Sequence, residues 1–418
     1  MKIAGIVAEY NPFHTGHAHQ IACTRERLGD DCAVAAVMSG NWVQQADCAI
    51  ADKWTRAQLA LMGGVDLVLE LPTVWAVSTA ESFARGAVEI LNACGVVDVI
   101  SFGSECGRIE DLKQVAQCLN SPEYEENVRA LSNEGASFAV CRQRAVSSLL
   151  GEELGNLLSK PNNNLGVEYI RALSAIESKI EPMTVLRQGA QHNSVSGVIA
   201  RQADGTYRTG PAHMDMPRFV SATQLRADIQ EGDWDAAQPY LPEGGRAILE
   251  GSTVSLPSLE QVGRAMLSRL RTMTAGDWAA LPDSGAAEGL PQRLERAGRS
   301  CTGMAEFFDL AKTKRYTRAR LNRLVLWAYL GLRLTDVPER PPYIRVLGFN
   351  DRGREVLRHM KERSTLPVIT KPTHARRLDP EGRALFELER RCTDLYDLCL
   401  GTIPVPGREW TSGPVTAP

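Results

Sequence analysis

The sequence predicts an α/β fold built on a Rossmann-like, doubly wound parallel sheet, with a mainly helical C-terminal domain behind it. Two observations support this fold class. Short apolar segments alternate with helix-like segments at the spacing of βαβ units as far as residue 187, and small polar turns follow several of them. From Gly232 onward the strand signal fades, and helix-like segments separated by Pro and Gly replace it.

Each element of the first domain has its own local signal. The near-continuous apolar run at 32–38 is typical of a strand buried on both faces. One stripe of apolar residues in 78–94 indicates an amphipathic helix. The other expected strands are 3–7, 65–70, 96–102 and 183–187, and the other expected helices are 17–27, 52–62, a helical insertion at about 108–158, and a helix through Leu173.

Three turns are expected together at one edge of this sheet, where the carboxyl ends of parallel strands collect ligands. They are residues 8–17, 39–48 and 103–106. In the first turn, His14 and His17 lie on either side of Gly16, just before a helix. A helix N-terminus attracts anions, glycine lets a phosphate approach the backbone, and imidazoles donate hydrogen bonds. We interpret the turn as a phosphate site; ordinary turn and surface histidines are the alternative.

The string Glu-Tyr-Asn-Pro-Phe-His-Thr-Gly-His at 9–17 contains the His-x-Gly-His signature of the nucleotidylyltransferase superfamily. With further segments it resembles the tRNA(Met) cytidine acetate ligase family, in patches from Met1 to about Lys361. The resemblance implies a nucleotidylyltransferase-type sheet that binds ATP, with His14 and His17 as catalytic residues. It also implies nucleotide contacts along the whole turn, which consists of Val7, Ala8, Glu9, Tyr10, Asn11, Pro12, Phe13, His14, Thr15, Gly16, His17, Ala18, His19 and Gln20.

Other family blocks supply further candidates. Residues 39–44 and 52–56 match two blocks, and Gly103 in a third corresponds to a nucleotide-contacting position. Lys53, a third catalytic candidate, and Arg56 could neutralise phosphate charge from the first turn of a helix; the alternative is that both are solvated helix residues. The chain departs from the family at 45–48, where a more basic, Arg-Gly-like sequence is expected.

Three later segments complete the expected ATP site. Residues 160–169 resemble a family block in which an asparagine contacts the nucleotide, which favours Asn162 and then Asn163; a capping turn is the alternative. Arg187 matches an ATP-contacting arginine, although Gln191-His192 stands where the family tends to have an aromatic-His pair. Residues 221–226 resemble a degenerate second phosphate motif, a helix start with Ser221, Thr223 and Arg226.

The charge distribution separates the two halves. Residues 301–400 contain 20 Lys and Arg against 13 Asp and Glu, whereas residues 1–300 have a net balance of −10. The stretch 312–323 holds six cationic residues and one tyrosine, which suits an RNA backbone. A solvated amphipathic helix is the alternative. The RNA-binding candidates are Lys314, Arg315, Arg318, Arg320 and Arg323.

From these patterns we expect three parts: a catalytic domain at 1–230, a basic helical tRNA-binding domain at 231–403, and a loose tail at 404–418. The ten cysteines show no zinc spacing and indicate a reducing compartment. No signal peptide and no membrane-spanning run is recognisable, so the cytoplasm is the expected location. Neither a protein metal site nor an oligomeric state is predicted.

The residues themselves point to adenylyl transfer, in which an anionic nucleophile attacks the α-phosphate of ATP. Mg²⁺ would be held by phosphates and water rather than by a protein cage. The family resemblance implies that acetate is activated as acetyl-adenylate and that the acetyl group passes to N4 of the wobble cytidine of elongator tRNA(Met). Two alternatives remain open: a small-molecule nucleotidylyltransferase, and a non-catalytic RNA-binding protein.

Overall fold

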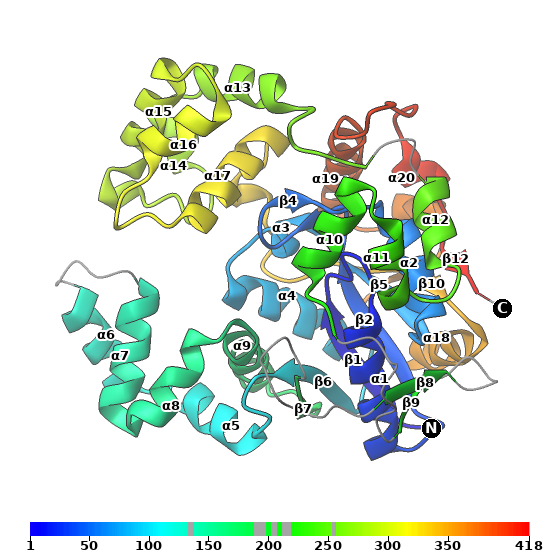
Figure 1. Ribbon diagram of the computed structural model, residues 1–418. Helices are drawn as coiled ribbons and strands as arrows, with labels where there is room; N and C mark the ends of the chain where they lie inside the picture. Colours follow the sequence, from blue (N-terminus) through cyan, green and yellow to red (C-terminus); the bar gives the residue numbers. More distant parts are fainter. Residues whose placement is uncertain (133–137, 188–197, 202–206, 211–218, 253–255, 418) are drawn as a thin grey trace.

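The computed structural model describes residues 1–132, 138–187, 198–201, 207–210, 219–252 and 256–417 (Figure 1). Its centre is an eight-stranded sheet with the order β11-β10-β5-β2-β1-β6-β7, and β12 pairs with β10 off this path. The strands are β1 (Ile3–Ala8), β2 (Ala33–Ser39), β5 (Leu67–Leu71), β6 (Val99–Ser104), β7 (Glu181–Leu186), β10 (Ile344–Phe349), β11 (Val368–Ile369) and β12 (Val415–Thr416).

The parallel part of the sheet confirms the predicted fold class. β5, β2, β1, β6 and β7 all run parallel to one another, and they correspond to the five expected strands. β2 is buried along its whole length, and its side chains alternate between two cores. Ala35 and Val37 belong to one core, whereas Ala36 and Met38 belong to the other, as expected for a strand covered on both faces.

Helices cover both faces of this sheet. Buried residues of α1 (Thr15–Leu28), α2 (Lys53–Met62), α10 (Ala222–Glu231) and α12 (Gly245–Ser252) join one core. Buried residues of α4 (Ala80–Ala93), α5 (Ile109–Cys118) and α9 (Pro161–Ala175) join the other. Further helices are α3 (Thr73–Ala76), α11 (Trp234–Ala237), α18 (Asp351–Arg363), α19 (Pro380–Asp397) and α20 (Arg408–Thr411).

Two helical groups project from the sheet (Figure 1). The first continues α5 with α6 (Pro122–Ser132), α7 (Phe138–Leu150) and α8 (Glu152–Asn156). The second, which we call the helical body, contains α13 (Gly263–Thr272), α14 (Ala275–Ala279), α15 (Leu290–Ser300), α16 (Met304–Ala311) and α17 (Arg318–Leu330). Trp327 of α17 anchors this body because its Nε1 donates to the Val77 carbonyl at 2.7 Å.

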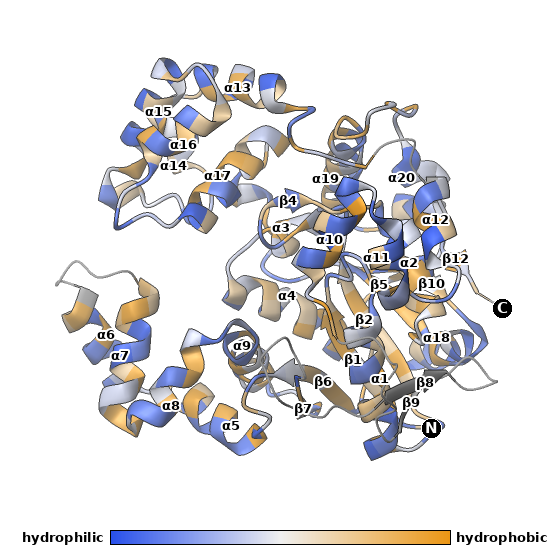
Figure 2. Cartoon of the chain, in the orientation of Figure 1, coloured by the Kyte–Doolittle hydropathy of each residue, from blue (hydrophilic) through white to orange (hydrophobic). Residues whose placement is uncertain are grey.

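Two short hairpins complete the secondary structure. β3 (Trp42–Val43) pairs with β4 (Asp47–Cys48) within the second expected turn, and β8 (Val198–Arg201) pairs with β9 (Tyr207–Gly210). Figure 2 shows apolar residues concentrated on the sheet and on the helix faces turned toward it. Among the described residues, no helix combines the length and apolar character needed to span a bilayer.

The second half of the chain departs from the expected division. β10 lies inside the region expected to be a mainly helical separate domain, yet it pairs antiparallel with β5 of the sheet. The expectation of a loose tail at 404–418 is wrong: residues 408–411 form α20, and β12 pairs with β10. The sheet therefore includes residues from both ends of the chain. The helical body, at 263–330, contributes no strand to the sheet, although its buried residues join one of the two cores.

Candidate active site

The turn between β1 and α1 holds both histidines in a fixed orientation. His14 is the N-cap of α1, and its Nδ1 accepts a hydrogen bond from the Gly16 backbone N–H at 3.0 Å. Nδ1 of His17 accepts from the His14 backbone N–H at 3.2 Å. Because both Nδ1 atoms act as acceptors, each neutral ring carries its proton on Nε2. The two rings, 4.0 Å apart between centroids, thus present a pair of N–H donors.

Burial keeps these imidazoles neutral. It lowers the pKa of His14 to about 4, with help from the nearby Arg187 and Arg226 guanidinium groups. The pKa of His17 is also depressed well below its usual value, mainly by burial and then by His14 and Arg187. Both rings therefore act as neutral hydrogen-bond donors near pH 7.

Arg187 forms one wall of the site together with Gly103. A Cβ added to Gly103 would lie 2.9 Å from Cγ of Arg187, so glycine leaves room for the arginine side chain. The Arg187 guanidinium donates to Oδ1 of Asn162 at 3.0 Å. Nδ2 of Asn162 donates in turn to Glu105 at 2.7 Å. The residues expected from three distant segments are therefore brought together.

Asn163 has a different role from Asn162. It is buried, and its Oδ1 accepts from the backbone N–H groups of Glu105 and Cys106 at 2.9 and 3.1 Å. These bonds fix the loop after β6. Asn162, which contacts Arg187, is thus the better candidate for a ligand contact, and Asn163 supports the loop around it.

The start of α10 lies against the other side of the turn. Ser221 caps the helix by accepting from the Gln224 backbone N–H at 3.1 Å. Arg226, one turn later, donates to the Asn11 carbonyl at 3.0 Å and to the Thr223 hydroxyl at 3.2 Å. This arrangement places a cation and a hydroxyl beside the histidine turn, as the motif predicts.

The remaining residues of the turn mostly support its shape. Tyr10 and Phe13 are buried with their ring centroids 4.9 and 5.4 Å from that of His17. Oδ1 of Asn11 accepts from the Ile50 backbone, and Gln20 donates to the Ser101 carbonyl. His19 contacts Phe219 instead of the two paired rings. The other expected contacts belong to the end of β1 (Val7, Ala8), the turn (Glu9, Pro12) and the start of α1 (Thr15, Ala18).

Arg56 holds the turns in place and does not face a ligand. It is fully buried, and its guanidinium donates to the backbone carbonyls of Glu9, Ser39 and Gly40. The carboxylate of Glu9 accepts from the Gln44 backbone N–H at 2.8 Å. These bonds connect the histidine turn with the turn after β2. The expectation that Arg56 neutralises phosphate charge is not supported by this geometry.

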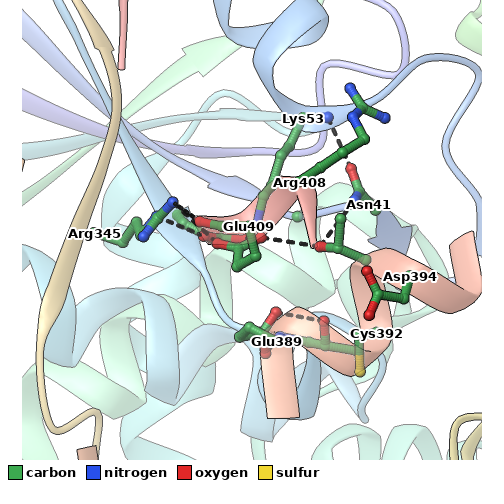
Figure 3. A network of polar contacts seen from close by, with 12 residues as sticks. Asn41, Lys53, Arg345, Glu389, Cys392, Asp394, Arg408 and Glu409 are labelled. Carbon is green, nitrogen blue, oxygen red and sulfur yellow. Dashed lines mark hydrogen bonds and ion pairs between the residues drawn. The ribbon is translucent and has the colours of Figure 1, made fainter. Parts of the chain in front are cut away.

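Lys53 also lies elsewhere than expected. Its side chain is 1% exposed, and its ammonium forms ion pairs with Glu70 at 2.6 Å and Glu409 at 2.7 Å. Arg345 pairs with the same Glu409 at 3.1 Å (Figure 3). A lysine neutralised by two buried carboxylates is not available to a phosphate. We therefore correct its assignment from catalytic residue to buried structural cation.

The sequence pattern did not reveal this network, because its members come from α2, β5, β10 and α20. Glu409 is separated from Lys53 by more than 350 residues and stands in a segment with four prolines. Burial of these four charged residues gives no local periodicity that could have identified the network. The only signal was the uncommon presence of Glu70 in the otherwise apolar run at 67–71.

The five RNA-binding candidates differ in their surroundings. Arg320 forms ion pairs with Asp283 and Glu288, and Arg323 pairs with Asp283 at 3.0 Å. Arg315 lies 3.6 Å from Glu288 and is largely exposed. Arg318 lies over the ring of Phe308, 3.6 Å from its centroid, and Lys314 is exposed. Arg320 and Arg323 therefore stabilise the helical body, which leaves Lys314, Arg315 and Arg318 as the better RNA candidates.

Comparison with known proteins identifies the group to which this site belongs. A model of the HIGH Nucleotidyl Transferase family matches residues 1–404. The chain belongs to this family. The tRNA(Met) cytidine acetate ligase of Thermoanaerobacter sp. (strain X514) is 34% identical over 98% of each chain. The tRNA(Met) cytidine acetate ligase of Caldanaerobacter subterraneus subsp. tengcongensis is 36% identical over 95% of each chain.

Solved structures agree with these relatives. Thermotoga maritima TmcAL bound with alpha-thio ATP has a TM-score of 0.86 and 32% identity, and the match covers 100% of this chain and 99% of that one. The apo form of the same protein has a TM-score of 0.87 and is 33% identical in sequence. The chain thus belongs among the tRNA(Met) cytidine acetate ligases of the HIGH nucleotidyl transferase family, which confirms the resemblance and the fold class inferred from its motifs.

Proposed function

We propose that this chain is an ATP-dependent tRNA(Met) cytidine acetate ligase. The observation that supports this activity most directly is the pair of neutral Nε2–H donors on His14 and His17, flanked by Arg187 and Arg226. Fixed donors beside two cations suit a phosphate on which negative charge develops during reaction. The identity of the relatives supports the choice of acetate and of tRNA(Met) as substrates.

The first step is activation of acetate. A carboxylate oxygen of acetate attacks the α-phosphorus of ATP, and the bond from that phosphorus to the bridging oxygen of pyrophosphate breaks. Acetyl-adenylate forms and pyrophosphate leaves. His14 and His17 donate to the equatorial oxygens, Arg187 and Arg226 neutralise their charge, and Gly103 leaves room for the Arg187 side chain. Ser221 and Thr223 contribute hydroxyl groups near the same anion.

The second step transfers the acetyl group. N4 of the wobble cytidine attacks the carbonyl carbon, the bond between that carbon and the AMP oxygen breaks, and N4 loses a proton. The helical body and its exposed cations hold the tRNA in this proposal. None of the ten cysteines, which all lie in the described residues, forms a disulfide, and this suits the cytoplasm, where tRNA and ATP are available.

Mg²⁺ would enter this site on the phosphates of ATP and not on a protein cage. Among the described residues, no group of three His, Cys, Asp or Glu side chains is arranged to hold a metal ion. When bound, the ion supplies charge neutralisation on the phosphates. No role of the histidines or arginines depends on it.

His14→Asn tests the proposal. Asparagine keeps an N-cap acceptor, so α1 stays capped, but its shorter side chain does not reach the position of the imidazole Nε2. We expect acetate-dependent pyrophosphate release to fall by about 10²–10³-fold, the usual effect of removing one such donor. His359→Asn, at an exposed position on α18, is the matched control.

The acceptor is identified by mass spectrometry of nucleosides from elongator tRNA(Met) incubated with protein, ATP and acetate. N4-acetylcytidine that depends on all three components is the expected product. Pyrophosphate release only with another small acceptor would favour a small-molecule nucleotidylyltransferase. Failure to bind ATP would favour a non-catalytic RNA-binding protein.

A further inference from the structure

A cavity of about 550 Å³ lies between the sheet domain and the helical body. One side is the β3–β4 hairpin, at residues 45–47, and the other sides are α13, α16 and α17. Its size falls in the range of small-molecule and nucleotide sites, roughly 300–1,000 Å³. None of the histidines or arginines of the candidate active site lines it. The cavity is therefore distinct from the candidate active site.

The hairpin connects this cavity with the histidine turn. The Gln44 backbone N–H donates to the Glu9 carboxylate at 2.8 Å, and Glu9 stands at the start of the turn that carries His14. The next three residues of the same hairpin line the cavity. A molecule in the cavity is thus separated from the adenylate site by the hairpin.

The lining combines apolar and cationic groups. Met266, Phe308 and Leu326 are buried apolar residues on its helical side. The Arg318 guanidinium covers the Phe308 ring at 3.6 Å, and its Nε donates to Asn322 at 3.0 Å. Such a flat, oriented guanidinium is a surface on which a nucleobase stacks. Arg264, exposed at the edge, supplies a second cation for a phosphate.

The arginines of α17 differ in whether a carboxylate compensates their charge. Arg320 and Arg323 are paired with Asp283 or Glu288, so their charge is already compensated. Within the described part of the chain, no ion pair at 4 Å or less joins a carboxylate to Arg264 or Arg318. Two carboxylates, Asp47 and Glu260, also line the cavity. Carboxylates accept hydrogen bonds from exocyclic amino groups such as cytosine N4.

We propose that this cavity binds one unstacked nucleotide of the tRNA anticodon loop. The base stacks on Arg318 above the apolar residues, Arg264 neutralises its phosphate, and Asp47 or Glu260 accepts from an amino group of the base. The proposal rests on the proposed function, because it takes RNA to be the substrate. It adds a place where the RNA is held next to the adenylate site.

Gly263 offers a direct way to block the cavity. It lines the cavity in the first turn of α13, and a Cβ built on it meets no atom within 4 Å. Gly263→Leu therefore adds bulk to the cavity and improves helix propensity without a clash. Gly276→Leu in α14 of the same helical body is the matched control, since its Cβ makes only an ordinary 3.6 Å contact and the residue does not line the cavity.

The experiment measures the Kd of elongator tRNA(Met) for each variant by fluorescence anisotropy at one fixed salt concentration. We expect Gly263→Leu and Arg318→Ala to weaken binding by about tenfold, the order of the loss of one stacked base. Gly276→Leu should stay within twofold of the unchanged protein. Affinities within twofold for both cavity variants would overturn the proposal, as would equal losses in Gly263→Leu and its control.

Acetate-dependent pyrophosphate release, measured without RNA, separates the two proposals. Gly263→Leu should release pyrophosphate at the rate of the unchanged protein, because its side chain lies outside the ATP site. A protein that releases none, but whose tRNA affinity still depends on Gly263, would refute acetate activation and support the RNA cavity. Loss of release only in Gly263→Leu would instead overturn the assignment of the cavity to RNA.

Discussion

Removing the Glu409 carboxylate should destabilise the whole sheet. Its oxygens pair with Lys53 at 2.7 Å and Arg345 at 3.1 Å, and they accept from the Thr393 hydroxyl at 3.0 Å. Glu409→Ala leaves two buried cations with Glu70 as their nearest remaining partner. Breaking a buried ion pair from one side costs about 3–5 kcal/mol.

This loss converts to a shift in melting temperature. An unfolding entropy of about 2.1 cal/mol/K per residue, applied to 418 residues, gives a decrease in Tm of roughly 3–6 °C. Differential scanning calorimetry and urea unfolding measure it. Glu387→Ala on α19 is the control, because Glu387 pairs with Arg390 near the surface and such a pair contributes about 0–1 kcal/mol.

A double variant tests whether charge balance is the cause. Lys53→Met with Glu409→Met removes one cation and one carboxylate together, which leaves Arg345 with Glu70. Most of the lost stability should return, since apolar replacement of a whole buried pair is often neutral. The same variant should retain acetate activation, which a catalytic Lys53 could not allow. A decrease below 1 °C in Glu409→Ala would refute the reasoning.

Three further predictions concern the site and its surroundings. Burial lowers the pKa of His14 to about 4, so His14 stays neutral near pH 6.5 and the rate of acetate activation should not fall there because of this group. A decrease in rate between pH 7 and pH 6 that disappears in His14→Asn would contradict this prediction. Gly103→Ala should raise the KM for ATP by about tenfold in steady-state kinetics, because its Cβ displaces Arg187; an unchanged KM would show that Arg187 does not contact ATP. Burial raises the pKa of Glu389 to about 8, whereas its value in the unfolded chain is 4.5. As the pH rises, the unfolded chain therefore loses this proton before the folded protein does, and the free energy of unfolding should fall between pH 4.5 and pH 8. Glu389→Gln should flatten that slope in urea titrations at several pH values.

The sequence was sufficient for the elements whose signal is local. The apolar run at 32–38 and the apolar stripe in 78–94 predicted β2 and α4, and five strands in βαβ order predicted the parallel sheet. The turn with His14 and His17 could be located because its residues are consecutive. Arg187 and Arg226 could be placed beside it only through family blocks, since their approach depends on tertiary folding.

Long-range pairing explains what the sequence did not predict. β10 has a strand-like pattern, but nothing in residues 344–349 indicates an antiparallel pairing with β5, almost 280 residues earlier. Prolines in 404–418 suggested a loose segment, whereas burial of Glu409 and the pairing of β12 order it. Lys53 resembled a rim cation because its two carboxylate partners come from other elements.

The pairing of Lys53 with Glu409 has a consequence for biosynthesis. During translation, Lys53 is available for hundreds of residues before its second carboxylate partner is made, and β10 and β12 join the sheet only after residue 343. The histidine turn between β1 and α1 is synthesised first, but the sheet that supports it is completed late. Until residues 344–349 are made, β5 has no partner strand on that side, so a nascent chain should hold an exposed strand edge there.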